Sequence, residues 1–154
     1  MSHIRLGDVY DIDDDLIRML PEGDRSFHAS RPFVVLNDIG NDQQHWPVVM
    51  GCPISSSAKS TTAFCVQLQS GEAGMNKTSW IRVAALQPLE KSDLAPSRWR
   101  GRLPAQRLAE VRGNILFYLG LRIPSTPSAD ADANISRLAD AYNPDQESRD
   151  HAGG

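Results

Sequence analysis

The chain has 154 residues, of which 40% are hydrophobic and 23% are charged, an ordinary composition for a soluble globular protein. This length suits one domain with a real core and is too short for two. No apolar stretch approaches the roughly 20 residues that span a bilayer, and the first residues lack the apolar core of a signal peptide. We therefore expect a cytoplasmic protein with no membrane partner.

The net charge of −3 argues at first against a nucleic-acid partner. Its distribution changes that interpretation. Residues 125–154 hold six acidic and two basic residues, so this segment contributes −4 and the remainder of the chain +1. Five aspartates of the remainder lie among the first fifteen residues, which leaves the body between residues 16 and 124 distinctly basic.

The first predicted strand runs from Gly7 to Asp13, where apolar and polar residues alternate as in a half-buried strand. Residues 13–30 are polar and contain Pro21 and Gly23, so they indicate a long loop with at most one helical turn. A loop of this length in a compact domain is often functional. Short β-branched and aromatic runs predict four more strands, at 31–36, 46–54, 63–68 and 79–86.

From Pro104 the hydrophobic period becomes helical, with an apolar face at Leu108, Val111, Ile115 and Leu119. Proline suits a first helical turn, and Gly120 suits the stop. Five short strands without long helices between them indicate a small antiparallel barrel or half-barrel, on which this helix packs its apolar stripe.

After Pro124 the composition turns to Ser, Ala, Asp and Pro, which is typical of a linker or flexible tail. We therefore predict one domain at 1–123 and an acidic, flexible tail at 124–154. Within the tail, Ile135, Leu138 and Tyr142 fit one face of a short helix.

The two cysteines, Cys52 and Cys65, lie in no Cys-x-x-Cys or Cys/His cluster, so we expect neither a metal site nor a cofactor. A lasting disulfide between them is disfavoured in the cytoplasm. We interpret both as small buried thiols on strands.

Five segments carry a family resemblance. They are Gly7-Asp8-Val9, Arg31-Pro32-Phe33-Val34-Val35-Leu36, Cys52-Pro53-Ile54-Ser55-Ser56, the strand from Ser79 to Leu86 after a Gly-rich turn, and the helix end Leu119-Gly120-Leu121. In this order and spacing they resemble the MazF/PemK-type toxins of type II toxin–antitoxin systems.

The resemblance implies a mainly β fold with a C-terminal helix, an SH3-like barrel of the MazF/PemK/CcdB kind. It also implies a homodimer and a sequence-specific, metal-independent endoribonuclease that cleaves single-stranded RNA. A cognate antitoxin protein is the further partner that it implies. The tail, with its acidic and apolar residues, is similar in composition to an antitoxin segment, so it either dampens activity in cis or merely solubilises the chain.

Cleavage of RNA without a metal uses the substrate's own 2′-OH as nucleophile, so the enzyme must stabilise charge on the phosphoryl oxygens and move protons. Arg31 is the first catalytic candidate, because a guanidinium fork matches two phosphate oxygens. The alternative is a surface arginine paired with one of the carboxylates at residues 13–15. Ser55 aligns with the family's catalytic threonine, with the hydroxyl kept and the methyl lost. The alternative for Ser55 is a simple turn after a strand.

The general base remains open among Glu22, Asp24 and His28 in the first loop. His28 is the catalytic candidate, because histidines titrate near neutral pH, although an exposed loop histidine is often idle. The RNA-binding candidates are Lys77, Ser56, Ser79, Arg82 and Glu22.

Three aromatic or basic features stay open. Trp46 and Trp80 are expected on strands, in the core or stacked on bases. The basic run Arg98–Arg102 suits contact with an RNA backbone or the rim of a dimer.

A competing interpretation keeps the fold but makes it a non-catalytic domain that binds RNA or protein. A gyrase poison of the CcdB kind is disfavoured, because the chain ends Asp150-His151-Ala152-Gly153-Gly154 and lacks the aromatic-Gly-Ile terminus of those toxins.

Overall fold

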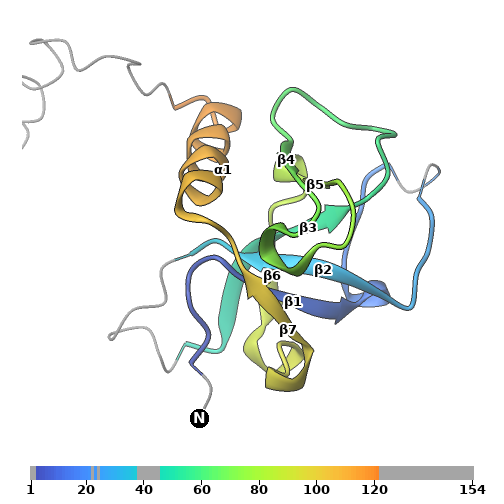
Figure 1. The fold of residues 1–154 in the computed structure, drawn as a ribbon, viewed down its shortest axis with the longest axis vertical. Coiled ribbons are helices and arrows are strands. Elements are labelled where there is room, and N and C mark those ends of the chain that lie inside the picture. Colours follow the sequence, from blue (N-terminus) through green and yellow to red (C-terminus); the bar gives the residue numbers. More distant parts are fainter. Residues whose placement is uncertain (1–2, 22, 24, 38–45, 122–154) are drawn as a thin grey trace, which may run out of the picture. The chain divides into compact units, whose positions relative to one another are not determined.

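The computed structural model describes residues 3–21, 23, 25–37 and 46–121. The candidates Glu22 and Asp24 and the predicted tail at 124–154 lie outside the described residues. The described part contains seven strands, shown in Figure 1: β1 (Asp8–Asp13), β2 (Ser30–Val35), β3 (Val48–Ser55), β4 (Val66–Leu68), β5 (Ser79–Ile81), β6 (Gln87–Glu90) and β7 (Trp99–Arg102).

The strands follow the order β4-β5-β3-β2-β1-β7, with β6 also paired to β3, and each pairing is antiparallel. The long strand β3 closes the structure into a half-barrel. Its first half, from Val48 to Gly51, pairs with β6, while Ile54 and Ser55 pair with β5. Gly51 is needed at the crossing, because a Cβ there would lie 2.0 Å from the carbonyl oxygen of Val34.

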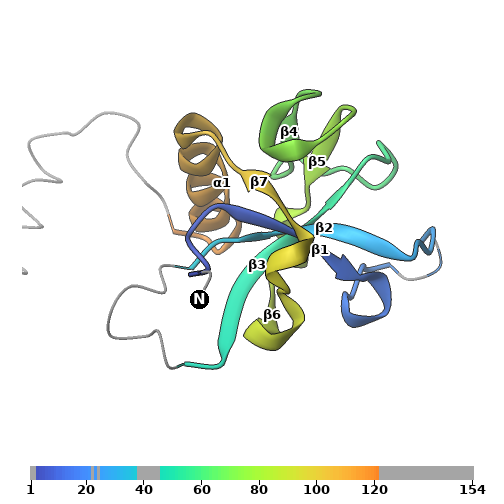
Figure 2. The ribbon, with the colours of Figure 1, turned by 60° about the horizontal axis from the view of Figure 1, so that its bottom comes forward.

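Alternation along the central strands feeds two apolar clusters on opposite sides of the sheet. One contains Val9, Val34 and Ile54, and α1 and β4 pack on it; the other contains Phe33 and Leu89 and lies beneath β6. Figure 2 shows β4, β5 and α1 on one side of β2 and β6 on the other. On this second face, polar side chains beyond the end of the apolar cluster can form a site.

The helix α1 (Ala105–Tyr118) begins after Pro104, which lies at the N-cap position rather than in the first turn. It ends at Leu119, followed by Gly120 with a φ of +79°. Val111 is fully buried and Leu108 and Ile115 pack beside it, so the predicted stripe is confirmed up to its last member. Leu119 is 58% exposed.

The antiparallel half-barrel with one C-terminal helix confirms the predicted fold class, but several details differ. The predicted strand 79–86 ends at Ile81, because a 3-10 turn (Val83–Ala85) follows. Trp46 lies before β3 and is 57% exposed, so it is not a core residue, and Cys65 lies before β4. Both cysteines are free thiols.

Two strands were absent from the sequence prediction. The short strand β6 contains a proline, and β7 lies within the basic run Arg98–Arg102, for which the sequence predicted no secondary structure. None of the helices within the described ranges has the length and apolar character of a membrane span.

Candidate functional site

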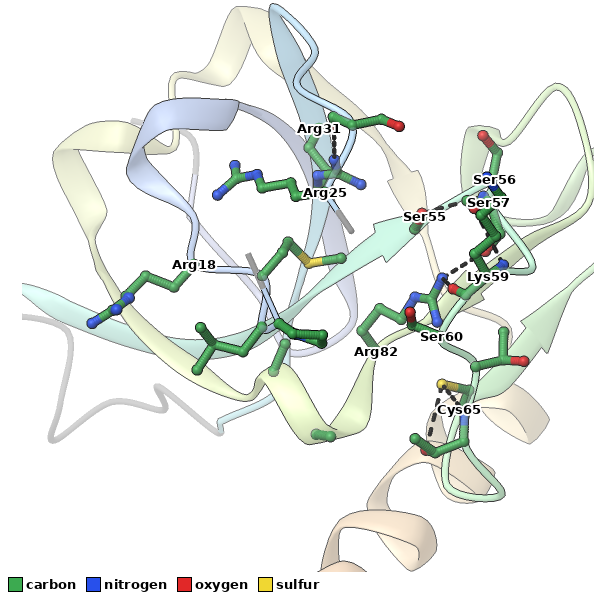
Figure 3. A pocket seen from close by; sticks show the side chains of 18 of the residues that line it. Arg18, Arg25, Arg31, Ser55, Ser56, Ser57, Lys59, Ser60, Cys65 and Arg82 are labelled. Atoms are coloured by element: carbon green, nitrogen blue, oxygen red, sulfur yellow. Dashed lines mark hydrogen bonds between the residues drawn. The ribbon is translucent and has the colours of Figure 1, made fainter. Parts of the chain in front are cut away.

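A pocket of about 630 Å³ opens where the second face of the sheet meets the loops (Figure 3). Three segments line it: described residues of the first loop between Arg18 and Arg31, the end of β3 with the loop from Ser55 to Cys65, and the segment from Arg82 to Gln87. Its size falls within the range of about 300–1,000 Å³ that is usual for ligand sites. No carboxylate is among the described residues that line it, whereas several cations are.

A buried carboxylate organises one wall of the pocket. Asp14 follows β1 directly and is 1% exposed; its Oδ1 accepts a hydrogen bond from Nε of Arg31 at 2.8 Å and forms an ion pair with Nη2 of Arg25 at 2.9 Å. Its Oδ2 accepts one from the backbone N–H of His28 at 2.9 Å. The two guanidinium side chains are themselves 5% and 6% exposed. Two cations thus share one anion in a buried cluster, so one positive charge has no carboxylate partner among the described residues.

The pKa of Asp14 reflects this arrangement. Burial, the largest single effect, acts to raise the pKa. The hydrogen bond from Arg31, the backbone N–H of His28, the charge of Arg31 and the hydrogen bond from Arg25 together outweigh it and hold the pKa below its ordinary value of 3.8. Asp14 is therefore ionised at neutral pH.

The strand register places Arg31 where the sequence predicted it, at the start of a strand below the long loop. Arg31 pairs with Ile12 across β1 and β2, and the chain turns from β1 directly into Asp14. Nη2 of Arg31 donates to the carbonyl of Ser26 at 3.1 Å, and among the described residues Nη1 has no partner. The guanidinium is thus fixed along one edge and keeps donors for a ligand.

Ser55 ends β3 and is 7% exposed on the pocket wall. Its Oγ accepts the backbone N–H of Ser57 at 3.2 Å, which leaves the hydroxyl proton for another acceptor. Phe33 pairs with Pro53, so continuing this register places Ser55 opposite Arg31 on the same face of the sheet. Ser56 is exposed and lines the pocket beside it.

Arg82 follows β5 and enters the same pocket from the other side of β3 (Figure 3). It is 7% exposed, and its Nη2 donates to the carbonyls of Ser57 at 2.5 Å and Lys59 at 2.8 Å. Nε and Nη1 are buried without a hydrogen-bond partner in the described part of the chain. No carboxylate among the described residues neutralises this cation.

The structure brings only some of the sequence candidates together. Arg31, Ser55, Ser56, His28 and Arg82 all line the pocket, and His28 is exposed there. Lys77 and Ser79 do not line it.

Lys77 is exposed in the turn before β5, and the buried hydroxyl of Ser79 donates to the Lys77 carbonyl at 3.0 Å. That hydrogen bond gives the Ser79 hydroxyl a structural role within the turn. Neither residue adds a group to the wall that holds Arg31.

The basic run at 98–102 forms ion pairs with β1. Arg98 pairs with Asp13 at 2.8 Å, Arg100 with Asp11 at 3.1 Å, and Arg102 with Asp8 at 2.9 Å. The indole N–H of Trp99 also donates to Asp8, at 3.2 Å. The N-terminal aspartates therefore neutralise this run, whereas Arg25, Arg31 and Arg82 at the pocket share a single carboxylate, that of Asp14, within the described residues.

Two residues that shape the site were missed from the sequence. Asp14 had been considered only as the partner of a non-catalytic arginine, and Arg25 had no signal, because the path of the loop decides whether it turns inward. Cys65 also lines the pocket, with the backbone N–H of Thr62 donating to its Sγ at 3.4 Å. Within the described residues, no group of three or more His, Cys, Asp or Glu side chains is placed to hold a metal ion.

Comparison with protein families identifies residues 8–119 as a match to the PemK-like, MazF-like toxins of type II toxin–antitoxin systems. This match spans more than half of the chain, so the chain belongs to that family. The resemblance carried by the five sequence segments is thereby confirmed. Comparison with curated protein sequences gives no match.

Solved structures share the fold at low identity. An endoribonuclease crystallised with its cognate antitoxin, from a mycobacterial species, is 17% identical with a TM-score of 0.56, covering 80% of this chain and all of that one. A MazE–MazF complex from Deinococcus radiodurans is 23% identical with a TM-score of 0.56, covering 79% and 100%. The Mycobacterium tuberculosis toxin MazF-mt6 is 19% identical with a TM-score of 0.58, covering 75% and 99%.

Proposed function

We propose that this chain is the toxin of a toxin–antitoxin module and acts as an endoribonuclease, cleaving single-stranded RNA at specific sequences by attack of a 2′-OH on the adjacent phosphate, without a metal. The observation that carries the proposal is the buried Arg25–Asp14–Arg31 cluster, which presents net positive charge beside the hydroxyl of Ser55. An uncompensated buried charge is costly, so this wall favours an anionic ligand such as a phosphodiester.

Arg31 is proposed to stabilise the charge that grows on the phosphoryl oxygens. Asp14 holds its Nε and so fixes the guanidinium before substrate arrives, while Nη1 has no hydrogen-bond partner among the described residues. A preorganised donor of this kind accelerates the reaction because it needs no reorganisation as charge develops. Arg25 adds a second positive charge to the same wall, and its Nη2 lies 2.9 Å from Asp14.

Ser55 is proposed to donate its hydroxyl proton to a phosphate oxygen, since its Oγ already accepts the N–H of Ser57. His28 is proposed as the group that moves protons, because it is the one histidine among the described residues that line the pocket, and imidazoles are common general acids and bases. Its backbone is fixed by Asp14, whereas its side chain is exposed. Lys77, exposed outside the pocket, is proposed as a contact for RNA beyond the cleavage site.

The proposed partners follow from the family. Two of the similar structures contain an antitoxin or MazE, which supports a cognate antitoxin as the partner of this chain. A homodimer is proposed on the same family grounds. We also propose that residues 1–123 form the catalytic domain and that the acidic segment 124–154 is a separate tail.

The test is cleavage of a mixed-sequence single-stranded RNA in EDTA by the wild type and by Arg31→Ala. Loss of one preorganised donor to the transition state lowers kcat by about 10²- to 10³-fold. Arg98→Ala is the matched control, because Arg98 is paired with Asp13 outside the pocket, and it should cleave normally. The products should carry 2′,3′-cyclic phosphate ends, and a 2′-deoxy residue at the cleavage site should block the reaction.

Three results would count against the proposal. Cleavage that stops in EDTA would refute the metal-free route. Equal cleavage by the wild type and Arg31→Ala would remove Arg31 from the reaction. RNA binding without cleavage by the wild type would favour the non-catalytic alternative.

A further inference from the structure

Arg82 is bound in a way that a purely structural role does not explain. Its Nη2 alone holds the loop after β3, through the carbonyls of Ser57 and Lys59. Nε and Nη1 contribute nothing to that loop, yet both are buried without a partner among the described residues. A buried, unpaired N–H has lost its hydrogen bonds to water without replacing them, which is unfavourable. A structural tie would not require this cost, whereas an anion bound in the pocket would remove it.

Arg82 and Arg31 approach the pocket from opposite sides of β3. Arg82 donates its backbone N–H to Pro53 at 2.9 Å, and Pro53 pairs with Phe33, two residues after Arg31. Arg82 and Arg31 thus lie on the same face of the sheet, two strands apart, which is roughly 10 Å between their backbones. Figure 3 labels Arg31, Ser55 and Arg82 at the pocket, which all three residues line.

Each of the two arginine sites also carries a positive charge of its own. Among the described residues, the cluster around Asp14 has one positive charge without a carboxylate partner, and Arg82 has another, held only by carbonyls. One phosphodiester bears a single negative charge and cannot neutralise both positions. A ligand with two consecutive phosphates supplies one anion to each.

We infer that Arg82 forms a second phosphate subsite, which binds the phosphate next to the one held by Arg31. The inference rests on the proposed function and specifies its substrate: the pocket takes a nucleotide step with a phosphate on both sides. Arg82 then contributes to substrate affinity, and Arg31 to the chemical step. A dinucleotide with one phosphate fills only half of the site.

The experiment measures binding, without cleavage, of three thymidine trinucleotides of equal length. One carries two normal phosphodiesters, and the others carry a neutral methylphosphonate at the first or the second linkage. The wild type should bind the probe with two charges about tenfold more tightly than either of the others, as expected for one lost charge-assisted interaction. Arg82→Gln should bind all three within about twofold, at the weaker wild-type level.

Arg82→Gln removes the positive charge and, because its amide ends two bonds short of the Nη2 position, also weakens the tie to the Ser57 and Lys59 carbonyls, so its thermal unfolding is measured beside that of the wild type. Arg98→Gln is the matched control and should keep the tenfold preference, since Arg98 is paired with Asp13 outside the pocket. If Arg82→Gln does not fold, the wild-type comparison still tests whether the pocket binds two phosphates. A wild type that binds all three probes equally overturns the inference.

The outcome separates the inference from the proposed function. A preference for two phosphates that depends on Arg82, in a protein that does not cleave RNA, leaves the subsite standing and refutes catalysis. Cleavage that needs Arg31, with no preference for two phosphates, refutes the subsite alone. A folded Arg82→Gln that keeps the full preference also refutes it.

Discussion

Replacing Asp14 by asparagine should destabilise the protein strongly. The substitution keeps the size of the side chain and removes the negative charge that Arg25 and Arg31 share at 2.9 and 2.8 Å. Because all three side chains are at most 6% exposed, two guanidinium groups would be left buried without an anion. Removing one partner from a buried ion pair typically costs about 3–5 kcal/mol.

The matched control is Asp13→Asn, at the neighbouring position. Asp13 also pairs with an arginine at 2.8 Å, but its side chain is 56% exposed and that of Arg98 34%. A solvated pair of this kind contributes about 0–1 kcal/mol. The two variants therefore differ in burial while sharing the residue type, the partner type and the contact distance.

The assay is urea unfolding of the wild type and both variants at several pH values. At pH 7, Asp14→Asn should lose about 3–5 kcal/mol, with a midpoint of thermal unfolding lower by roughly 10–25 °C. The folded pKa of Asp14 is depressed below 3.8, so the stability that its ionised form contributes is fully present above that value. This stability is lost as the pH falls from about 3.8 through the folded pKa. The difference in unfolding free energy between the wild type and Asp14→Asn should therefore narrow over that pH range.

Equal losses in Asp14→Asn and Asp13→Asn at pH 7 would refute the argument from burial. If the difference in unfolding free energy between the wild type and Asp14→Asn stays constant well below pH 3.8, ionisation of Asp14 is not the cause of that difference.

Three further outcomes are expected. At pH 8 a maleimide should label Cys65 at the pocket and block RNA binding, while Cys52 stays unlabelled. Burial, with a smaller effect from the Cys65 charge, raises the pKa of Cys52 to about 12, so this thiol is protonated at pH 8. Detection of labelled Cys52 by mass spectrometry would contradict this. Gly51→Ala should lower the free energy of unfolding by at least about 3 kcal/mol, since its Cβ would lie 2.5 Å from the Phe33 ring. Gly113→Ala in α1 has open space and should raise that free energy by about 0.5–1 kcal/mol. Urea unfolding measures both. Deleting residues 125–154 should raise the cleavage rate or the RNA affinity if the acidic tail dampens activity, and an unchanged rate and affinity would exclude that role.

The parts of the fold that could be predicted are those where the hydrophobic period is strong. β1, β2, β3 and α1 were placed to within one or two residues, because alternation or helical spacing fixes which side chains are buried. β6 and β7 were missed because one contains Pro88 and the other is half arginine, and only pairing with β3 and β1 makes them strands. Tertiary contact overrides local propensity in both cases.

Only those residues of the candidate site that lie on predicted strands could be placed from the sequence. Arg31 and Ser55 lie at strand ends, so a predicted strand implies their place. Asp14 and Arg25 depend on how the first loop folds back, for which residues 13–30 contain no periodic pattern. Burial of the Asp14 carboxylate, which turns a surface ion pair into the organiser of the pocket, follows from that loop alone.

The ion pairs between β7 and β1 bear on how ionic strength should affect RNA binding. Arg98, Arg100 and Arg102 already face aspartates, so they are not available to displace counterions from RNA. For single strands, the logarithm of the binding constant falls with the logarithm of salt concentration by about 0.7 for each phosphate neutralised. Although the chain has 16 basic residues, its RNA binding should therefore show the shallow salt response of a few cations, those of the pocket and Lys77. Its affinity for RNA should persist at salt concentrations that release proteins with many unpaired surface cations.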